Sequence, residues 1–173
     1  MNKDYKTGTD ALANVSNNLR ILGESLNPVD QMLSCNDTTR AFGLVLPPDG
    51  ALELAGSRAD ALAKTGRVEF GECAVRKIIL EFCDSPYLTQ DTYAETLGEL
   101  TQIFYYFKNE LEWMSDGELI GRMKKYFDTV CRGSIGHLNL VLESMVHDMR
   151  YGCWDEAGLL PETDVFLRED ADE

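Results

Sequence analysis

The sequence has no long hydrophobic run. Its apolar stretches are only a few residues long, whereas a membrane-spanning helix needs about 20 predominantly apolar residues. Residues 1–6 carry charges with no apolar core behind them, so they do not resemble a secretory signal. We therefore expect no membrane association and a cytoplasmic protein.

Positive charge is also scarce. The chain has 16 Lys and Arg residues against 30 Asp and Glu residues, which gives a formal net charge of −14. Because nucleic-acid binding depends on basic side chains that replace the counterions of phosphates, direct binding of DNA or RNA is not expected. The surplus acid is typical of a solvated surface, and docking on a basic partner is the less favoured explanation.

Metal-binding patterns are missing. The two histidines, His137 and His147, lie ten residues apart in one predicted helix and therefore on different faces. None of the five cysteines forms a C-x-x-C pair, which is the spacing typical of zinc sites and redox dithiols. Glu143 and His147 could supply half of a metal site, but their place away from the apolar stripe favours an exposed polar stripe. We predict no metal and no cofactor.

Catalytic signatures are equally sparse. Neither G-x-x-x-x-G-K-[ST] nor G-x-G-x-x-G occurs. Cys83 ends a predicted helix beside Asp84, and both a helix C-terminus and a carboxylate raise the pKa of a thiol. Cys73 lies near a helix start, but no histidine is close in sequence to act as its base. We assign no catalytic residue, and a non-enzymatic protein is favoured.

Apolar residues at every third or fourth position predict an all-α fold. Helices are expected over about residues 10–26, 29–33, 48–64 and 72–83, and a long central helix over about 90–113 with Thr89 as its N-cap. Ser115 and Glu118 form a capping box that starts the next helix, and Ser134 caps the last long one. Five to six helices with short connections predict a bundle or an orthogonal array.

Some local expectations are more specific. Residues 42–46 and 67–70 have the pattern of short strands and are compatible with one two-stranded β element. The helix at 48–64 is expected to bury Leu52, Ala55, Ala59 and Leu62, whose mostly small size allows a close approach to a neighbour. The helix after Ser115 is expected to bury Leu119, Ile120, Met123, Tyr126, Phe127 and Val130.

The predicted organisation is a single helical domain over residues 1–154, followed by an acidic and flexible tail over residues 155–173. The tail has eight acidic residues and one basic residue, and too few apolar residues to hold it against the domain. The apolar residues that remain for docking are Leu159, Leu160, Val165, Phe166 and Leu167.

A polar pocket between helices is one explanation for the run Lys108-Asn109-Glu110, which interrupts an aromatic-rich helix surface. The other explanation is buried pairing with a neighbouring helix. If a pocket exists, it would hold a small ligand or an active site. Its candidate residues are Tyr87, Glu95, Tyr106, Lys108, Asn109 and Glu110.

Four motifs stand out: GRVEFG at 66–71, FCDSPY at 82–87, TQDTYAETL at 89–97 and FKNE at 107–110. Together they resemble an uncharacterised bacterial family that is known only as a domain of unknown function. The resemblance spans roughly residues 42–130. It implies a bacterial protein, and it brings no activity, cofactor or catalytic residue with it.

Two functional hypotheses therefore stand. The favoured one is a non-enzymatic helical interaction or adaptor module that binds a protein partner or a second copy of itself. It rests on a surplus of aromatic and methionine side chains, including Trp113, Met114, Met149 and Trp154. The alternative is a small-ligand-binding protein or an enzyme with an inter-helix polar pocket.

Overall fold

A computed structural model describes residues 27–69 and 72–151. Within these ranges the fold is all-α and contains no strand, which confirms the predicted fold class. The predicted helix at 10–26 and the acidic tail at 155–173 lie outside the described residues. In chain order the elements are α2 Pro28–Ser34, α3 Asn36–Thr39, the 3-10 turn η1 Arg40–Phe42, α4 Pro48–Thr65, α5 Ala74–Phe82, the 3-10 turn η2 Gln90–Thr92, α6 Tyr93–Glu110, α7 Asp116–Asp128 and α8 Ile135–Arg150.

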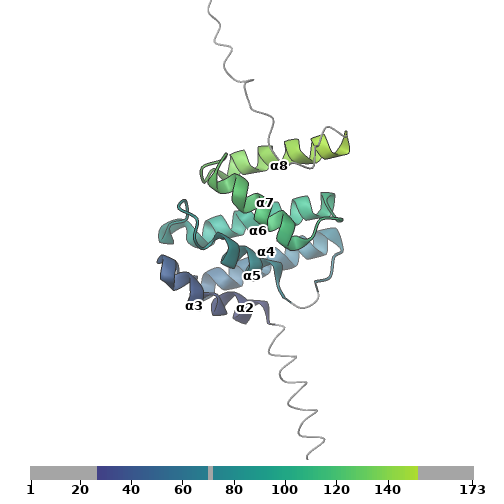
Figure 1. Cartoon of the computed structure of the whole chain (residues 1–173). Helices are drawn as coiled ribbons and strands as arrows, with labels where there is room; N and C mark the ends of the chain where they lie inside the picture. Colours follow the sequence, from purple (N-terminus) through teal and green to yellow (C-terminus); the bar gives the residue numbers. More distant parts are fainter. Residues whose placement is uncertain (1–26, 70–71, 152–173) are drawn as a thin grey trace, which may run out of the picture.

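Helix α6 is the centre of the fold. The helices form successive layers in Figure 1, from α2 and α3 at one end to α8 at the other, with α6 between α4 and α7. It packs against α4, α5, α7 and α8, because its apolar side chains cover more than one face. Half of its 18 positions are buried, so this helix has the central place that its sequence predicts.

The junction between α6 and α7 is fixed by local signals. The Glu118 backbone N–H donates to Ser115 Oγ at 3.2 Å, and the Ser115 N–H donates to Glu118 Oε2 at 2.9 Å. This confirms the predicted capping box. Met114 and Leu119, on either side of the cap, are both buried, as a hydrophobic staple requires.

The start and end of the long helix differ from the prediction. Helix α6 ends at Glu110 rather than near residue 113. Thr89 precedes the 3-10 turn η2, and the N-cap of α6 is Thr92. At the other capped start, Ser134 accepts from the His137 backbone N–H at 3.3 Å, as predicted.

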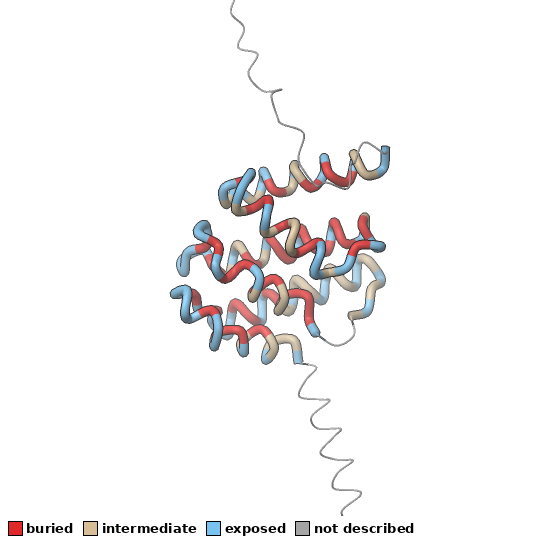
Figure 2. The backbone as a smooth tube through the Cα atoms, viewed as in Figure 1, coloured by how far each residue is buried: buried red, intermediate tan, exposed pale blue. Residues whose placement is uncertain are grey.

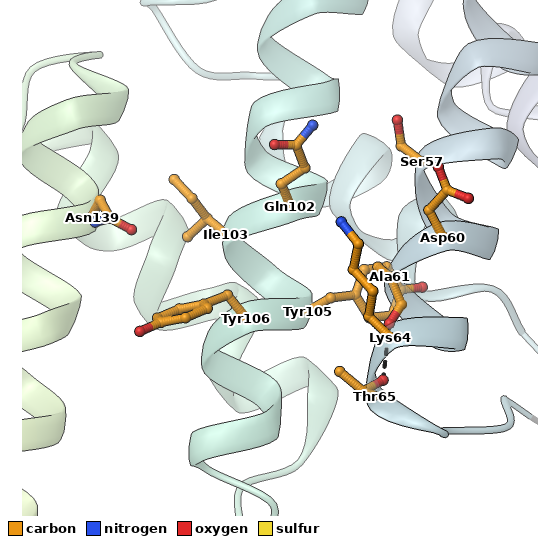
Figure 3. A pocket seen from close by; sticks show the side chains of 10 residues that line it. All are labelled: Ser57, Asp60, Ala61, Lys64, Thr65, Gln102, Ile103, Tyr105, Tyr106 and Asn139. Carbon is orange, nitrogen blue, oxygen red and sulfur yellow. Dashed lines mark hydrogen bonds between the residues drawn. The ribbon is translucent and has the colours of Figure 1, made fainter.

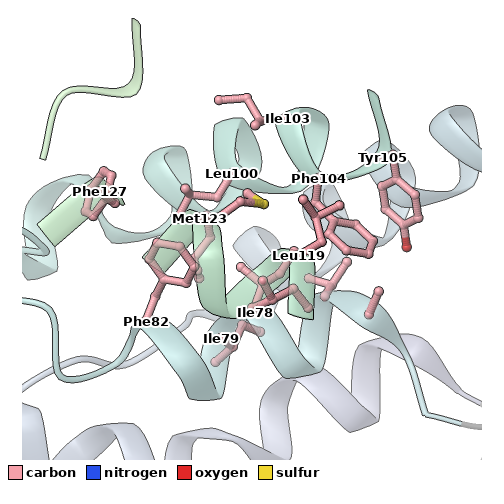
Figure 4. Close-up of a cluster of buried hydrophobic side chains, with 14 of the residues drawn as sticks. Ile78, Ile79, Phe82, Leu100, Ile103, Phe104, Tyr105, Leu119, Met123 and Phe127 are labelled. Carbon is pink, nitrogen blue, oxygen red and sulfur yellow. The ribbon is translucent and has the colours of Figure 1, made fainter. Parts of the chain in front are cut away.

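The core lies where α5, α6 and α7 meet. Figure 4 shows aromatic and aliphatic side chains from these three helices packed together, and the rings of Phe82 and Phe127 meet edge to face with centroids 5.5 Å apart. Figure 2 shows that buried positions recur along the inner side of each helix. Burial of these apolar surfaces is the main stabilising contribution to such a fold.

The face that helix α4 buries matches the predicted one only in part. Gly50, Ala51 and Leu54 are buried, whereas Leu52 is 59% exposed and Ala59 is also exposed. A Cβ placed on Gly50 would lie 3.1 Å from the Cβ of Ala94 in α6. The expected close approach through small residues is therefore correct. Of the four residues predicted to be buried, Ala55 and Leu62 are partly buried against the core, and Leu52 and Ala59 are not. The predicted burial of Val130 is also wrong, since this side chain is 37% exposed.

Residues 44–46 form no β element with residues 67–69, although their backbone needs hydrogen-bond partners as a strand does. The Asn36 side chain donates to the Leu46 carbonyl at 2.9 Å and accepts from the Leu46 N–H at 2.8 Å. Gln90 makes the same pair of bonds to Val45, at 2.9 and 2.7 Å. Two side-chain amides thus replace the neighbouring strand, and the predicted pairing of 42–46 with 67–70 was wrong over the described residues.

Candidate functional site

A polar cavity of about 280 Å³ lies where the segment after α4 meets α5, α6 and the start of α7. We call it the polar hollow. Most of its lining is charged. Its lining residues are Leu62, Arg67, Val68, Glu69, Glu72, Lys77, Phe104, Tyr105, Lys108 and Asp116.

Lys108 occupies an unusual position for a lysine. It lies one helical turn after Phe104 on α6, so its side chain points to the same inward face, and the residue is only 7% exposed. Its ammonium donates to the Met114 carbonyl and lies 3.3 Å from Asp116 Oδ1. Both partners belong to the α6–α7 junction that the capping box holds in place.

A partly buried network on the α4 side holds Glu69 at the edge of the hollow. The Tyr105 hydroxyl donates to Glu69 Oε1 at 2.6 Å, and Arg58 donates through Nε to Glu69 Oε2 at 2.7 Å. Burial, and next the hydrogen bond to Glu69, raise the pKa of Tyr105 far above its usual range. The network fixes the segment 67–69 against α4 and α6.

Arg67 and Lys77 supply the remaining cations. Gly66 ends α4 in the left-handed region, with φ +65°, and this turns the chain so that Arg67 Nη1 donates to the Lys108 carbonyl at 2.9 Å. From α5, Lys77 Nζ lies 3.6 Å from Asp116 Oδ2. Three cationic side chains from three separate elements therefore line the same small cavity.

The six pocket residues proposed from sequence do not converge on this cavity. Lys108 alone of the six lines it. The others lie elsewhere: the Tyr87 ring meets Phe127 edge to face, Glu110 forms an ion pair with Arg150, Tyr106 lines a separate groove, and Glu95 and Asn109 are exposed.

That groove is larger, with a volume of about 540 Å³, and lies along α6 between α4 and α8. Figure 3 shows Tyr106 and Ile103 on α6, with Lys64 on the α4 side and Asn139 on the α8 side. Its lining is more apolar than that of the hollow, and the Tyr106 side chain is 58% exposed. We call it the α6 groove. Its charged lining residues are Asp60 and Lys64, so it lacks the convergent charges of the hollow.

Arg67, Glu69, Lys77 and Asp116 were not identified as site residues from sequence. They come from the segment after α4, from α5 and from α7, and no local spacing connects them. The only signal was the unexplained lysine in the aromatic helix, since a buried ammonium requires partners from other elements.

The cysteines and histidines do not contribute to the hollow. Burial first, and Asp84 next, raise the pKa of Cys83, in the direction expected from sequence. Burial also raises the pKa of Cys73. The predicted polar stripe on α8 is confirmed, with Asn139 donating to Glu143 at 2.9 Å. Across residues 27–69 and 72–151, no group of three or more His, Cys, Asp or Glu side chains is placed to hold a metal ion.

No helix in the described part of the chain combines the length and the apolar composition needed to cross a membrane. The chain belongs to a family of unknown function, DUF6323, which matches residues 31–155. The resemblance recognised over residues 42–130 is thereby confirmed and extends further in both directions. No curated protein and no solved structure matches the chain.

Proposed function

We propose that this member of the DUF6323 family is a non-enzymatic binding module that holds a small polar molecule in the polar hollow. The observation that supports the proposal best is the Lys108 ammonium, which is buried but incompletely partnered. An ammonium has three N–H donors, and within the described residues Lys108 uses them on the Met114 carbonyl and Asp116. One donor is therefore left for a molecule in the cavity that Lys108 lines.

The surroundings of Lys108 favour this use. Burial of a charge is costly unless it is paired and hydrogen-bonded. A lysine that is only 7% exposed would therefore be an unfavourable residue to line a polar cavity that binds nothing. The groups around it come from helices and from a segment that the Glu69 network anchors. Convergent polar groups on rigid elements are typical of small-molecule sites.

The proposal includes binding and no chemical step. A general base needs a free, poised group within reach of its proton. In the hollow, Glu69 accepts from Tyr105 and Arg58, and Asp116 lies between two lysines. The Tyr105 hydroxyl is a donor with a raised pKa. These interactions position a ligand rather than transfer protons.

A thermal-shift panel tests the proposal. Anionic, cationic, zwitterionic and uncharged metabolites are added at millimolar concentration, and a ligand present at about 100 times its Kd stabilises the folded state by about 2.7 kcal/mol. We expect at least one compound to raise the Tm of the wild type. The shift is lost in Lys108→Met and weakened in Lys77→Met, and it is retained in Lys64→Met, a matched change in the α6 groove.

Because Lys108 is buried, Lys108→Met is first compared with the wild type by circular dichroism, and Lys77→Met provides the result if folding is lost. Two outcomes would contradict the proposal. One is that no compound of any charge class shifts the Tm of the wild type. The other is that every shift persists in both hollow variants.

Protein interaction is a second candidate function, favoured by the α6 groove. Tyr106 lines the groove and is 58% exposed. Leu140 on α8 does not line the groove but is 63% exposed. Exposed aromatic and aliphatic residues around a groove are typical of interaction surfaces. For this candidate we propose a second copy of the chain as the partner. Light scattering should then show a dimer that Tyr106→Glu dissociates, and a monomer at all concentrations would contradict it.

A further inference from the structure

The lining of the polar hollow carries as many positive as negative side chains, in a chain whose net charge is −14. Its lining contains three cations, Arg67, Lys77 and Lys108, and three carboxylates. Two of those carboxylates form ion pairs with arginines that do not line the cavity. The net charge that faces a ligand therefore depends on which of these side chains are already neutralised by an ion pair.

Glu69 and Glu72 are each paired outside the lining. Arg58 lies 2.6 Å from Glu69 through Nη2 and also donates to it through Nε. Arg76 forms an ion pair with Glu72 one helical turn away. Neither carboxylate is therefore available to balance the cations that face the cavity.

Asp116 is the third carboxylate, and two lysines share it at 3.3 and 3.6 Å. One carboxylate balances only one of them. The nearby Glu118 lies outside the lining and is exposed, so its attraction to Lys108 is screened by water. One lysine charge in the hollow thus remains unbalanced.

Arg67 adds a second unbalanced charge. Its guanidinium donates to the Lys108 carbonyl at 2.9 Å, and no carboxylate of residues 27–69 or 72–151 forms an ion pair with it. A guanidinium has five N–H donors in a planar fork that suits carboxylate and phosphate oxygens. Most of these donors are free for a ligand.

We infer that the molecule bound in the polar hollow is a small dianionic oxyanion, a phosphate monoester or a dicarboxylate. The inference rests on the proposed function and specifies its ligand class. Two unbalanced cations match two negative charges, and a phosphate monoester carries about −1.5 to −2 charges at pH 7. The Arg67 fork binds one pair of oxygens, and the spare Lys108 donor and Lys77 bind the remainder.

The cavity volume limits the size of this ligand. Pockets for drug-sized molecules range from about 300 to 1,000 Å³, and the hollow has about 280 Å³. It therefore fits a small metabolite. The Phe104 and Leu62 side chains in the lining offer apolar contact to a short carbon skeleton.

Isothermal titration calorimetry of the full chain tests the inference. The probes are inorganic phosphate and succinate, which separate the two sources of oxyanion, with glycerol and putrescine as uncharged and cationic controls. Ionic strength is held constant with sodium chloride, because unspecific attraction is screened by salt. We expect saturable binding of phosphate or succinate, and no saturable binding of glycerol or putrescine.

Arg67→Gln removes one unbalanced charge and the fork, and with them the hydrogen bond to the Lys108 carbonyl, so its fold is first compared with that of the wild type by circular dichroism. It should weaken binding of the favoured anion about tenfold or more, since charge-assisted bidentate hydrogen bonds are the strong ones. Arg40→Gln is the matched control, because Arg40, on η1, is exposed and does not line the hollow. Its nearest carboxylate partner is Asp37 of α3. Arg40→Gln should leave the affinity unchanged.

The failures of the two proposals are distinguishable. If neither anion binds, or if Arg67→Gln binds it as well as the wild type, the dianion inference is wrong. If an uncharged or cationic compound then shifts the Tm in a Lys108-dependent way, the hollow is still a ligand site of another class. If no compound does so, the proposed function fails as well.

Discussion

The Asn36 side chain offers a sharp test of how this fold satisfies its backbone without a sheet. It makes two hydrogen bonds to the backbone of Leu46, at 2.8 and 2.9 Å. Asn36 is 9% exposed and Leu46 is 1% exposed. Asn36→Ala therefore leaves a backbone N–H and a carbonyl buried with no partner, while helix propensity at the start of α3 changes in favour of alanine.

The expected loss of stability follows from the two orphaned groups. Leaving one buried polar group unsatisfied costs about 1–3 kcal/mol. We expect Asn36→Ala to lower the free energy of unfolding by about 3 kcal/mol, because some relaxation offsets the larger sum. For a protein of about this size, 1 kcal/mol corresponds to about 2–4 °C in Tm, so the Tm should fall by about 6–12 °C.

Gln90→Ala is the matched control. Gln90 makes the same pair of hydrogen bonds to the next residue, Val45, at 2.7 and 2.9 Å, but Val45 is 38% exposed and Gln90 is exposed. Water can replace the lost amide there, so we expect a loss of about 1 kcal/mol or less.

Urea unfolding followed by circular dichroism at 222 nm measures both variants under the same conditions. The midpoint gives the change in stability as long as the slope with urea stays that of the wild type. If Asn36→Ala costs no more than Gln90→Ala, burial does not set the cost of these bonds, and the account of residues 44–46 is refuted.

Three further predictions use the same urea assay. Gly133→Ala should lower stability by about 2 kcal/mol or more, because φ is +83° and the new Cβ would lie 2.5 Å from that of Tyr87. Gly136→Ala, in α8 with open space around the new Cβ, should raise stability by up to about 1 kcal/mol. Equal effects of the two substitutions would contradict this prediction. The Thr39 hydroxyl lies near the buried Tyr93 hydroxyl and lowers its pKa, but it donates to the Leu44 carbonyl, and the Tyr93 hydroxyl has no partner of good hydrogen-bond geometry within the described residues. Tyr93→Phe should therefore leave stability unchanged or raise it by up to about 1 kcal/mol; a clear loss would show that the contact with Thr39 is a stabilising hydrogen bond. Burial raises the pKa of Cys35 from 9.0 to about 11. Between these values the Cys35 thiol keeps its proton in the folded protein and loses it in the unfolded chain, so its contribution to stability is complete below pH 9 and is lost between pH 9 and 11. Cys35→Ala should reduce that loss, and a urea midpoint that does not change from pH 8 to pH 10.5 would argue against the prediction.

Local signals predicted the helices well where one residue type had one structural use. Ser115 and Glu118 satisfy each other across four consecutive positions, so nothing distant can alter that start. The buried face of α4 could not be predicted in this way. Its apolar residues Ala51, Leu52, Leu54 and Ala55 point in almost every direction around the helix. The close contact with α6 decides which of them is buried, and the spacing of apolar residues in α4 does not predict this contact.

The extended segment shows a second limit of periodicity. Residues 44–46 satisfy their backbone groups as a strand does, but the partners are side-chain amides from Asn36 and Gln90, 10 and 45 residues away. An alternating pattern predicts that a backbone will be extended, and it does not say what will pair with it. The expected strand partner at 67–69 instead bears Arg67 and Glu69 of the hollow.

The hollow itself depends on both kinds of information. One wall is built by a locally coded junction, because the capping box at Ser115 fixes Asp116 and the Met114 carbonyl that hold Lys108. The opposite wall is the segment 67–69, whose place depends on the distant partners of Glu69. Arg67, attached to that second wall, donates across to the carbonyl of Lys108 and so connects the two walls. A ligand that takes up the remaining Arg67 donors would therefore bind both walls at once, and its binding should stabilise the whole fold rather than one helix.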